Sequence, residues 1–133
     1  MPNAVTDTHA LIWYLQDDAR LSPRASQYFD ESERDGSRIY VPSICLIEII
    51  YLLEKGRIPP NTLTTFLADI QLPDTILDIV DLNLPIILEA RNVPRAIVPD
   101  MPDRIIAATA LHLALPLISR DSKIQLSSVT TIW

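Results

Sequence analysis

Short apolar runs alternate with helical segments along the chain, and this alternation constrains the fold more than any other sequence feature. The runs that are typical of buried strands are residues 4–7, 39–41, 76–80, 117–119 and 129–132. The segments with helical spacing or helix-start signals are residues 8–15, 22–36, 43–53, 63–70, 84–91 and 103–115. Parallel strands need crossover connections, which pack as helices on the faces of the sheet. The sequence therefore predicts an α/β protein with a three-layer α/β/α architecture and a central, mainly parallel sheet.

Length and composition narrow the possible functions. The 133 residues fit one compact domain over 1–133. A formal net charge of −6 argues against binding nucleic acid mainly through bulk positive charge, so any such action is expected to be local or metal-assisted. Two glycines are too few for a glycine-rich phosphate loop. The single cysteine, Cys45, lies among apolar residues and is expected to be a buried hydrophobe.

The sequence shows no sign of a membrane protein. No apolar run approaches the roughly 18 to 20 residues that a membrane span needs. The first residues, Met1-Pro2-Asn3, lack the basic start of a signal peptide. We therefore expect a cytoplasmic protein that does not associate with membranes.

Two acidic residues follow predicted strands directly. Asp7 ends the first strand, and Asp121 comes just after the strand at 117–119. In open parallel sheets, ligands bind beyond the carboxyl ends of the strands, near the point where strand order reverses. Both aspartates are therefore candidates for a functional site at that edge. Either could instead cap the helix or turn that follows it.

Glu48 interrupts the strongly apolar helix predicted at 43–53, which Ser43 is expected to cap. Its neighbours one helical turn away, Ile44 and Leu52, are both apolar. An ionised carboxylate that is buried without a partner costs several kcal/mol, so Glu48 needs a cation, hydrogen bonds or a proton. Either a distant arginine or a bound metal ion could supply the positive charge for Glu48. The metal ion is the more economical explanation because other acids are predicted nearby.

Asp103 begins the helix predicted at 103–115, and Asp100 precedes it by three residues. A carboxylate at a helix N-terminus is favoured by the helix dipole and by the free N–H groups, so capping alone would explain Asp103. Asp100 either joins one anionic cluster with Asp103 or points to solvent from its proline-flanked loop.

We expect the side chains of Asp7, Glu48, Asp103 and Asp121 to converge. Four carboxylates within a few ångströms repel one another strongly, and divalent cations make such an arrangement stable. Oxygen ligands without cysteine suit the hard ions Mg²⁺ and Mn²⁺. Such an ion can activate a water molecule and neutralise charge on a phosphodiester. The four acids are therefore predicted as metal ligands and catalytic residues for phosphodiester hydrolysis.

Three other residues are candidates for substrate contact. Arg104 directly follows Asp103 and Arg120 directly precedes Asp121, and a guanidinium binds phosphate in bidentate geometry. Either arginine could instead pair with an acid. Ser119 places a hydroxyl at the same edge. His9 is close enough in sequence to contact the site, although a structural or surface role is favoured.

Four segments, taken in order, resemble the PIN-domain ribonucleases and, among them, the VapC-type toxins of bacterial type II toxin–antitoxin pairs. The segments are residues 6–13 (TDTHALIW), 43–58, 99–111 and 117–121. The resemblance covers almost the whole chain. It implies a PIN fold, RNA cleavage with Mg²⁺ or Mn²⁺, homodimerisation and inhibition by a cognate antitoxin protein. It also implies that the acidic quartet consists of Asp7, Glu48, Asp103 and Asp121.

Large apolar side chains on two of the helical segments are compatible with such partners. These side chains are Trp13, Tyr14, Tyr51 and Leu52. An exposed apolar patch of this kind would suit a partner helix. Ordinary packing in the core is the alternative.

Two other functions fit a small acidic α/β chain. A Mg²⁺-binding receiver-type signalling domain would need an acidic pair near the first strand and a lysine after a late strand. Here Asp7 stands alone and the late strand is followed by Arg120 and Asp121, so that function is disfavoured. A catalytically inactive PIN-like binding module, which uses its acids only for structure, stays open.

Overall fold

The computed structural model describes residues 3–133, and its strands form one five-stranded sheet. The strands are β1 (Ala4–Thr6), β2 (Ile39–Pro42), β3 (Leu77–Val80), β4 (Leu117–Ile118) and β5 (Thr131–Ile132). All their pairings are parallel, in the spatial order β3-β2-β1-β4-β5. The strand order therefore reverses at β1, and a ligand site is expected where β1 and β4 end side by side.

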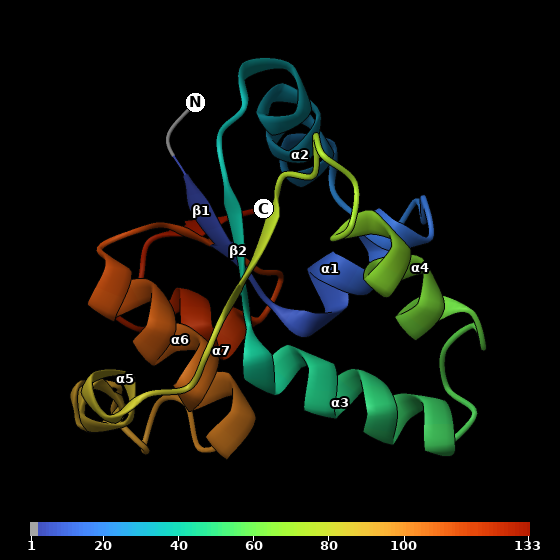
Figure 1. Ribbon diagram of the computed structural model, residues 1–133. Helices are drawn as coiled ribbons and strands as arrows, with labels where there is room; N and C mark the ends of the chain where they lie inside the picture. Colours follow the sequence, from blue (N-terminus) through green and yellow to red (C-terminus); the bar gives the residue numbers. More distant parts are fainter. Residues whose placement is uncertain (1–2) are drawn as a thin grey trace.

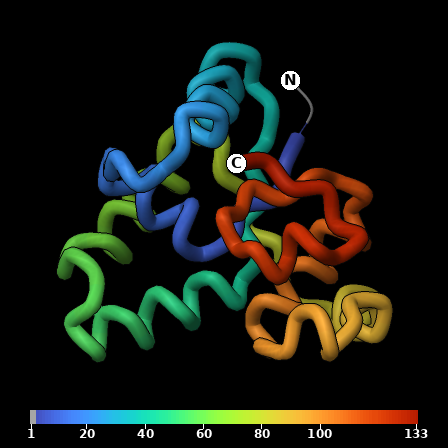
Figure 2. The backbone as a smooth tube through the Cα atoms, turned by 180° about the vertical axis from the view of Figure 1, so that it is seen from behind, coloured from blue at the N-terminus to red at the C-terminus, as the bar shows by residue number. Residues whose placement is uncertain are grey.

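Helices cover both faces of this sheet. They are α1 (Thr8–Leu15), α2 (Pro23–Asp35), α3 (Ser43–Glu54), α4 (Thr62–Asp69), α5 (Leu84–Glu89), α6 (Met101–Leu113) and α7 (Ser122–Gln125), with a short 3-10 helix, η1 (Ala90–Asn92), after α5. Figure 1 shows α1, α2 and α4 on one side of the sheet and α5 and α6 on the other, while α3 extends from the end of β2. The same three layers are visible from behind in Figure 2. The predicted three-layer α/β/α fold is confirmed, and the sheet is parallel throughout.

The core lies between the sheet and the helices on each face. Val5, Ile39 and Ile118 of the central strands are fully buried. Phe29 of α2 is also fully buried, and Tyr14 of α1 stacks on its ring with 4.2 Å between centroids. Burial on both faces explains why the strands appear in the sequence as continuous apolar runs without alternation.

Two helix starts differ from the prediction. Pro42, not Ser43, is the N-cap of α3, and the Ser43 hydroxyl instead accepts a hydrogen bond from the N–H of Leu82 at 3.2 Å. Helix α6 begins at Met101 because Asp100 is its N-cap. The sequence analysis also misses α7, since four residues are too few to show helical periodicity.

Trp13 and Cys45 are both buried. Trp13 is only 4% exposed and packs in the core, so of the two alternatives for this side chain the structure shows core packing. Cys45 is fully buried, as predicted, and burial raises the pKa of its thiol.

The topology also decides against the receiver-type domain. Receiver domains have the flavodoxin-like strand order 2-1-3-4-5. The order here is 3-2-1-4-5, so the receiver hypothesis is wrong. Within residues 3–133, no helix has the length and apolar character needed to cross a membrane. Met1 and Pro2, on which the signal-peptide expectation partly rests, lie outside the described residues.

Candidate functional site

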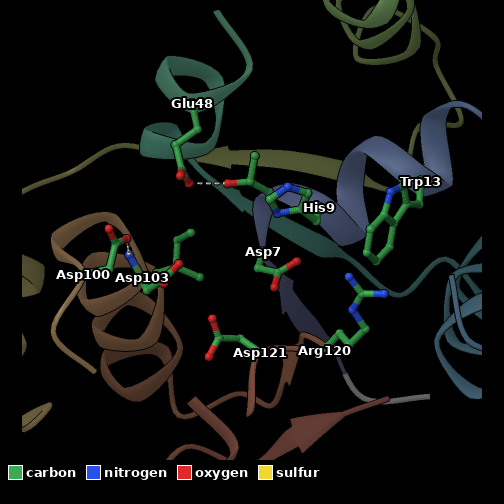
Figure 3. A pocket seen from close by; sticks show the side chains of 10 residues that line it. Asp7, His9, Trp13, Glu48, Asp100, Asp103, Arg120 and Asp121 are labelled. Atoms are coloured by element: carbon green, nitrogen blue, oxygen red, sulfur yellow. Dashed lines mark hydrogen bonds between the residues drawn. The ribbon is translucent and has the colours of Figure 1, made fainter. Parts of the chain in front are cut away.

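A pocket of about 330 Å³ opens at the carboxyl ends of β1 and β4, and we call it the acidic pocket. Its lining consists of Asp7, Thr8, His9, Trp13, Glu48, Asp100, Asp103, Ile106, Arg120 and Asp121. Figure 3 shows the carboxylates arranged around Asp7, with Arg120 and Trp13 on the opposite side from Asp100 and Asp103. The pocket thus contains all four acids that the sequence analysis predicts as the site, together with Asp100.

Asp7 and Asp121 are helix caps and also line the acidic pocket. Asp7 Oδ1 accepts the N–H of Ala10 at 2.9 Å, which caps α1. Asp121 Oδ1 accepts the N–H groups of Lys123 at 2.8 Å and Ile124 at 3.0 Å, which caps α7. A carboxylate has two oxygens, so a cap made through Oδ1 leaves Oδ2 available to other groups. The two roles that sequence analysis treats as alternatives are therefore compatible.

Burial raises the pKa of Asp7 above its ordinary value. A hydrogen bond from the Ser119 hydroxyl and the cap at Ala10 oppose this effect, while the neighbouring Asp121 carboxylate adds to it. The end of β1 therefore holds a carboxylate whose ionisation a nearby positive charge would favour.

Glu48 reaches the acidic pocket from α3. It is half-buried and opens toward the pocket, so its burial is less complete than its apolar neighbours in the helix suggest. Thr8 Oγ1 donates a hydrogen bond to Glu48 Oε1 at 2.5 Å. Burial raises the pKa of Glu48, and the bond from Thr8 lowers it. No arginine pairs with Glu48 among residues 3–133, where the ion pairs are Arg20–Asp18 and Arg38–Asp78.

Asp103 has a strongly raised pKa in the acidic pocket. It lies in the first turn of α6, where its backbone N–H donates to Asp100 Oδ2 at 3.2 Å. Burial raises the pKa of its carboxyl to about 7, and the carboxylates of Asp100, Asp121, Glu48 and Asp7 contribute to this increase. Like charges disfavour one another's ionisation, so this pocket would be stabilised by a cation.

The oxygen-rich lining of the acidic pocket suits a hard cation that keeps its water ligands, and it does not enclose an ion on all sides. In the described part of the chain, no three acidic, histidine or cysteine side chains are gathered closely enough to hold one ion. The expectation of four carboxylates enclosing an ion is therefore wrong in its geometry, because the carboxylates line the wall of an open pocket. Mg²⁺ keeps several water ligands and commonly uses one or two carboxylates. Such a wall fits that mode of binding.

Ser119 lies behind the acidic pocket and does not contact its interior. The residue is fully buried, and its hydroxyl accepts the backbone N–H of Asp121 at 3.0 Å. It also forms a hydrogen bond with the Asp7 side chain. Ser119 therefore positions two pocket acids, and the prediction that it contacts substrate directly does not fit its burial.

Arg104 points away from the acidic pocket. Its Nη2 donates to the carbonyl of Ala90 at 2.9 Å, and its Nε donates to the carbonyl of Val93 at 3.2 Å. The guanidinium thereby joins α6 to the first residue of η1 and to the residue that follows η1. The prediction of Arg104 as a substrate contact is wrong, because its side chain faces η1 and not the acidic pocket.

Replacing Arg104 by alanine is expected to lower the free energy of unfolding by about 1 kcal/mol, because two carbonyls lose a charged donor. Urea denaturation would measure the change. Arg95→Ala, in the exposed loop nearby, is the control and should leave stability within about 0.5 kcal/mol of wild type. Equal stability of Arg104→Ala and wild type would contradict the structural role.

Arg120 remains at the rim of the acidic pocket. It is exposed, and its Cζ lies 4.7 Å from the centroid of the Trp13 ring. None of the described carboxylates forms an ion pair with it. The His9 ring is tilted against Trp13 with 5.7 Å between centroids. An aromatic ring thus holds a cation beside the acids, as Figure 3 shows.

Sequence reasoning gave no site role to Trp13 and left that of Asp100 open. The Asp-x-Pro-Asp pattern at 100–103 is a helix-start signal that identifies Asp100 as a cap. No comparable local signal marks Trp13, because its position depends on contacts with residues far away in the chain.

Solved structures with the same fold include several toxin–antitoxin complexes. VapBC2 from Rickettsia felis, bound to a promoter DNA fragment, matches with a TM-score of 0.71 and 15% identity, over 97% of this chain and 96% of that chain. A toxin–antitoxin complex from Klebsiella pneumoniae matches with a TM-score of 0.68 and 22% identity, over 98% and 96%. DNA-bound VapBC from Salmonella typhimurium matches with a TM-score of 0.69 and 18% identity, over 98% and 97%. At these identities, the likeness concerns the fold.

Sequence comparison gives a family assignment. Comparison with curated proteins yields no match. The PIN domain family, however, matches residues 4–128, which include every strand except β5 and all of the acids in the pocket. This match covers most of the chain and agrees with the parallel sheet and the acidic pocket at its carboxyl end. The chain therefore belongs to the PIN domain family.

Proposed function

We propose that this protein is a ribonuclease that depends on Mg²⁺ or Mn²⁺ and acts as the toxin of a type II toxin–antitoxin pair. The acidic pocket is the observation that carries the proposal. Acids from four separate segments of a PIN domain line it, and between described residues no lysine or arginine forms an ion pair with them. Such a pocket suits a divalent cation and the phosphodiester that the cation would bind.

Each group in the acidic pocket has a role in this proposal. Asp7, Glu48, Asp103 and Asp121 would line the site of a hydrated ion, with Asp7 and Asp103 as the firmest direct ligands and the other two acids contacting its water molecules. The ion would supply an activated water and neutralise charge on the phosphodiester. The Thr8 hydroxyl orients Glu48, and the Ser119 hydroxyl orients Asp7 and Asp121. Arg120 is placed to bind a phosphate of the RNA at the rim.

The partners follow from the structural neighbours and from the surface. Because those neighbours are toxin–antitoxin complexes, we infer that this chain binds a cognate antitoxin. We also infer that residues 1–133 act as one domain and that the protein works in the cytoplasm. Helices α3 and α5 each expose three large apolar side chains with helical spacing, which supports a homodimer. They are Ile47, Ile50 and Tyr51 on α3, and Leu84, Ile87 and Leu88 on α5.

Purified protein, freed of any partner, is expected to cut single-stranded or structured RNA with Mg²⁺ or Mn²⁺. Chelation by EDTA should remove the activity, and added Mn²⁺ should restore it. Calorimetric titration with Mn²⁺ measures ion binding independently of cutting. Binding of Mn²⁺ without RNA cleavage would favour the catalytically inactive PIN-like module, whereas neither binding nor cleavage would show that the acids serve only a structural role.

A further inference from the structure

We propose that a second groove continues the acidic pocket and binds an RNA phosphate adjacent to the one that is cleaved. This inference rests on the proposed function. The groove has a volume of about 180 Å³, and we call it the arginine groove. Its polar lining consists of His9, Gln16, Asp18, Arg20 and Arg57.

The arginine groove and the acidic pocket share a wall. His9 and Trp13 of α1 line both cavities. Figure 3 shows His9 between Glu48 and Trp13, at the side of the acidic pocket away from Asp103. An RNA strand with one phosphate at the carboxylates therefore meets the arginine groove when it passes over His9.

An RNA strand that passes from the acidic pocket to the arginine groove needs positively charged side chains beside it. The acidic pocket repels every phosphate except one that a bound cation neutralises, and the whole chain has a net charge of −6. Arg20 and Arg120 both lie over the Trp13 ring, with Cζ-to-centroid distances of 5.4 Å and 4.7 Å. The indole of Trp13 therefore holds one guanidinium at each cavity.

Arg57 is the main free positive charge of the arginine groove. Arg20 is already engaged by Asp18, with 2.7 Å between Nη2 and Oδ2. Arg57 is exposed, and no carboxylate among residues 3–133 forms an ion pair with it. Its guanidinium is thus available for a phosphate, to which it can donate two hydrogen bonds.

A third cavity next to Trp13 is acidic and is therefore an unfavourable path for the RNA strand. This cavity lies between α1, α2 and α4 and has a volume of about 530 Å³. Its lining contains no lysine or arginine but five acids, namely Asp17, Asp18, Asp30, Glu33 and Asp69. Phosphates would be repelled there, so the strand is expected to leave toward Arg57 and not toward α2.

Salt-dependent RNA binding tests the arginine groove. Binding of a single-stranded oligoribonucleotide is measured in the Asp103→Asn protein, so that cleavage does not interfere. Adding Arg57→Ala should weaken binding about tenfold and reduce the slope of log affinity against log salt by about 0.7, because one phosphate contact is lost. The matched control is Lys55→Ala, since Lys55 is exposed, lies over Tyr51 and lines neither cavity. Its slope should stay unchanged.

The outcomes separate the two proposals. If Arg57→Ala and Lys55→Ala change affinity and slope equally, the arginine groove is not a phosphate site, while cleavage by wild type would still support the ribonuclease. If wild type cuts no RNA and binds none at low salt, the proposed function fails and this inference fails with it. Circular dichroism of each variant excludes unfolding as the cause.

Discussion

Replacing Asp103 by asparagine is expected to lower RNA cleavage at least about a hundredfold while the protein stays folded. The carboxylate is proposed to bind the catalytic ion, which contributes several kcal/mol to the stability of the transition state. Each 1.36 kcal/mol corresponds to a tenfold change in rate. Asparagine has nearly the same shape, and the N–H of residue 103 keeps its bond to Asp100. The fold is therefore not expected to change.

Single-turnover cleavage with Mn²⁺ measures this effect, and circular dichroism monitors the fold. Asp81→Asn, in the exposed loop before α5, changes the net charge equally and should cut RNA like wild type. Asp7→Asn should also abolish cleavage, because the negative charge is lost. The fold should be kept, because asparagine can still accept the N–H of Ala10 as the cap of α1. Equal residual activity in wild type, Asp7→Asn and Asp103→Asn would mean that the activity comes from a contaminant.

Without divalent ions, Asp103→Asn is expected to stabilise the folded protein at pH 8. The pKa of Asp103 is about 7 in the folded protein, above its ordinary value of 3.8. Well below pH 3.8 this carboxyl is protonated in both states, and its stabilising contribution is complete. As the pH rises toward 7 the unfolded chain ionises first, so wild type loses this contribution. Asparagine does not ionise, so the Asp103→Asn protein does not lose stability at this position as the pH rises.

The expected gain is about 1 to 2 kcal/mol at pH 8, or about 3 to 8 °C in Tm. The full pKa difference corresponds to about 4 kcal/mol, but Asp103 is partly exposed and solvent screens its charge. Thermal unfolding in EDTA at pH 4 and pH 8 measures the gain, which should be much smaller at pH 4 than at pH 8. Asp81→Asn is again the control. A variant no more stable than wild type at pH 8 would show that the pocket acids do not repel one another appreciably.

The positions of Asp7 and Asp121 could be inferred from the sequence because strand ends are local features. A buried apolar run followed by an acid places that acid at the carboxyl end of a strand, and parallel strands bring these ends to one edge. The structure places both aspartates in the acidic pocket. What the sequence could not decide was whether each acid caps a helix or faces the pocket, and the structure shows that each does both.

The two arginines that are adjacent in sequence to pocket acids show the limit of local reasoning. Arg104 and Arg120 are each next to a pocket acid in the sequence, yet Arg104 bonds to the carbonyls of Ala90 and Val93 while Arg120 lies over Trp13 at the pocket. The difference arises because Arg104 is on a helix whose turn directs its side chain away, whereas Arg120 follows the end of a strand. The partner of Glu48 is equally non-local, since Thr8 is 40 residues away.

The sequence by itself determined the layers, the parallel sheet and the edge at which the acids gather. These features depend on hydrophobic periodicity and on the position of acids relative to strand ends, which neighbouring residues define. Only the tertiary structure decided the strand order, the burial of Trp13 and Ser119 and the open form of the acidic pocket. Those properties depend on contacts between residues far apart in the chain, and a local pattern carries no information about which distant side chain will fill a given space.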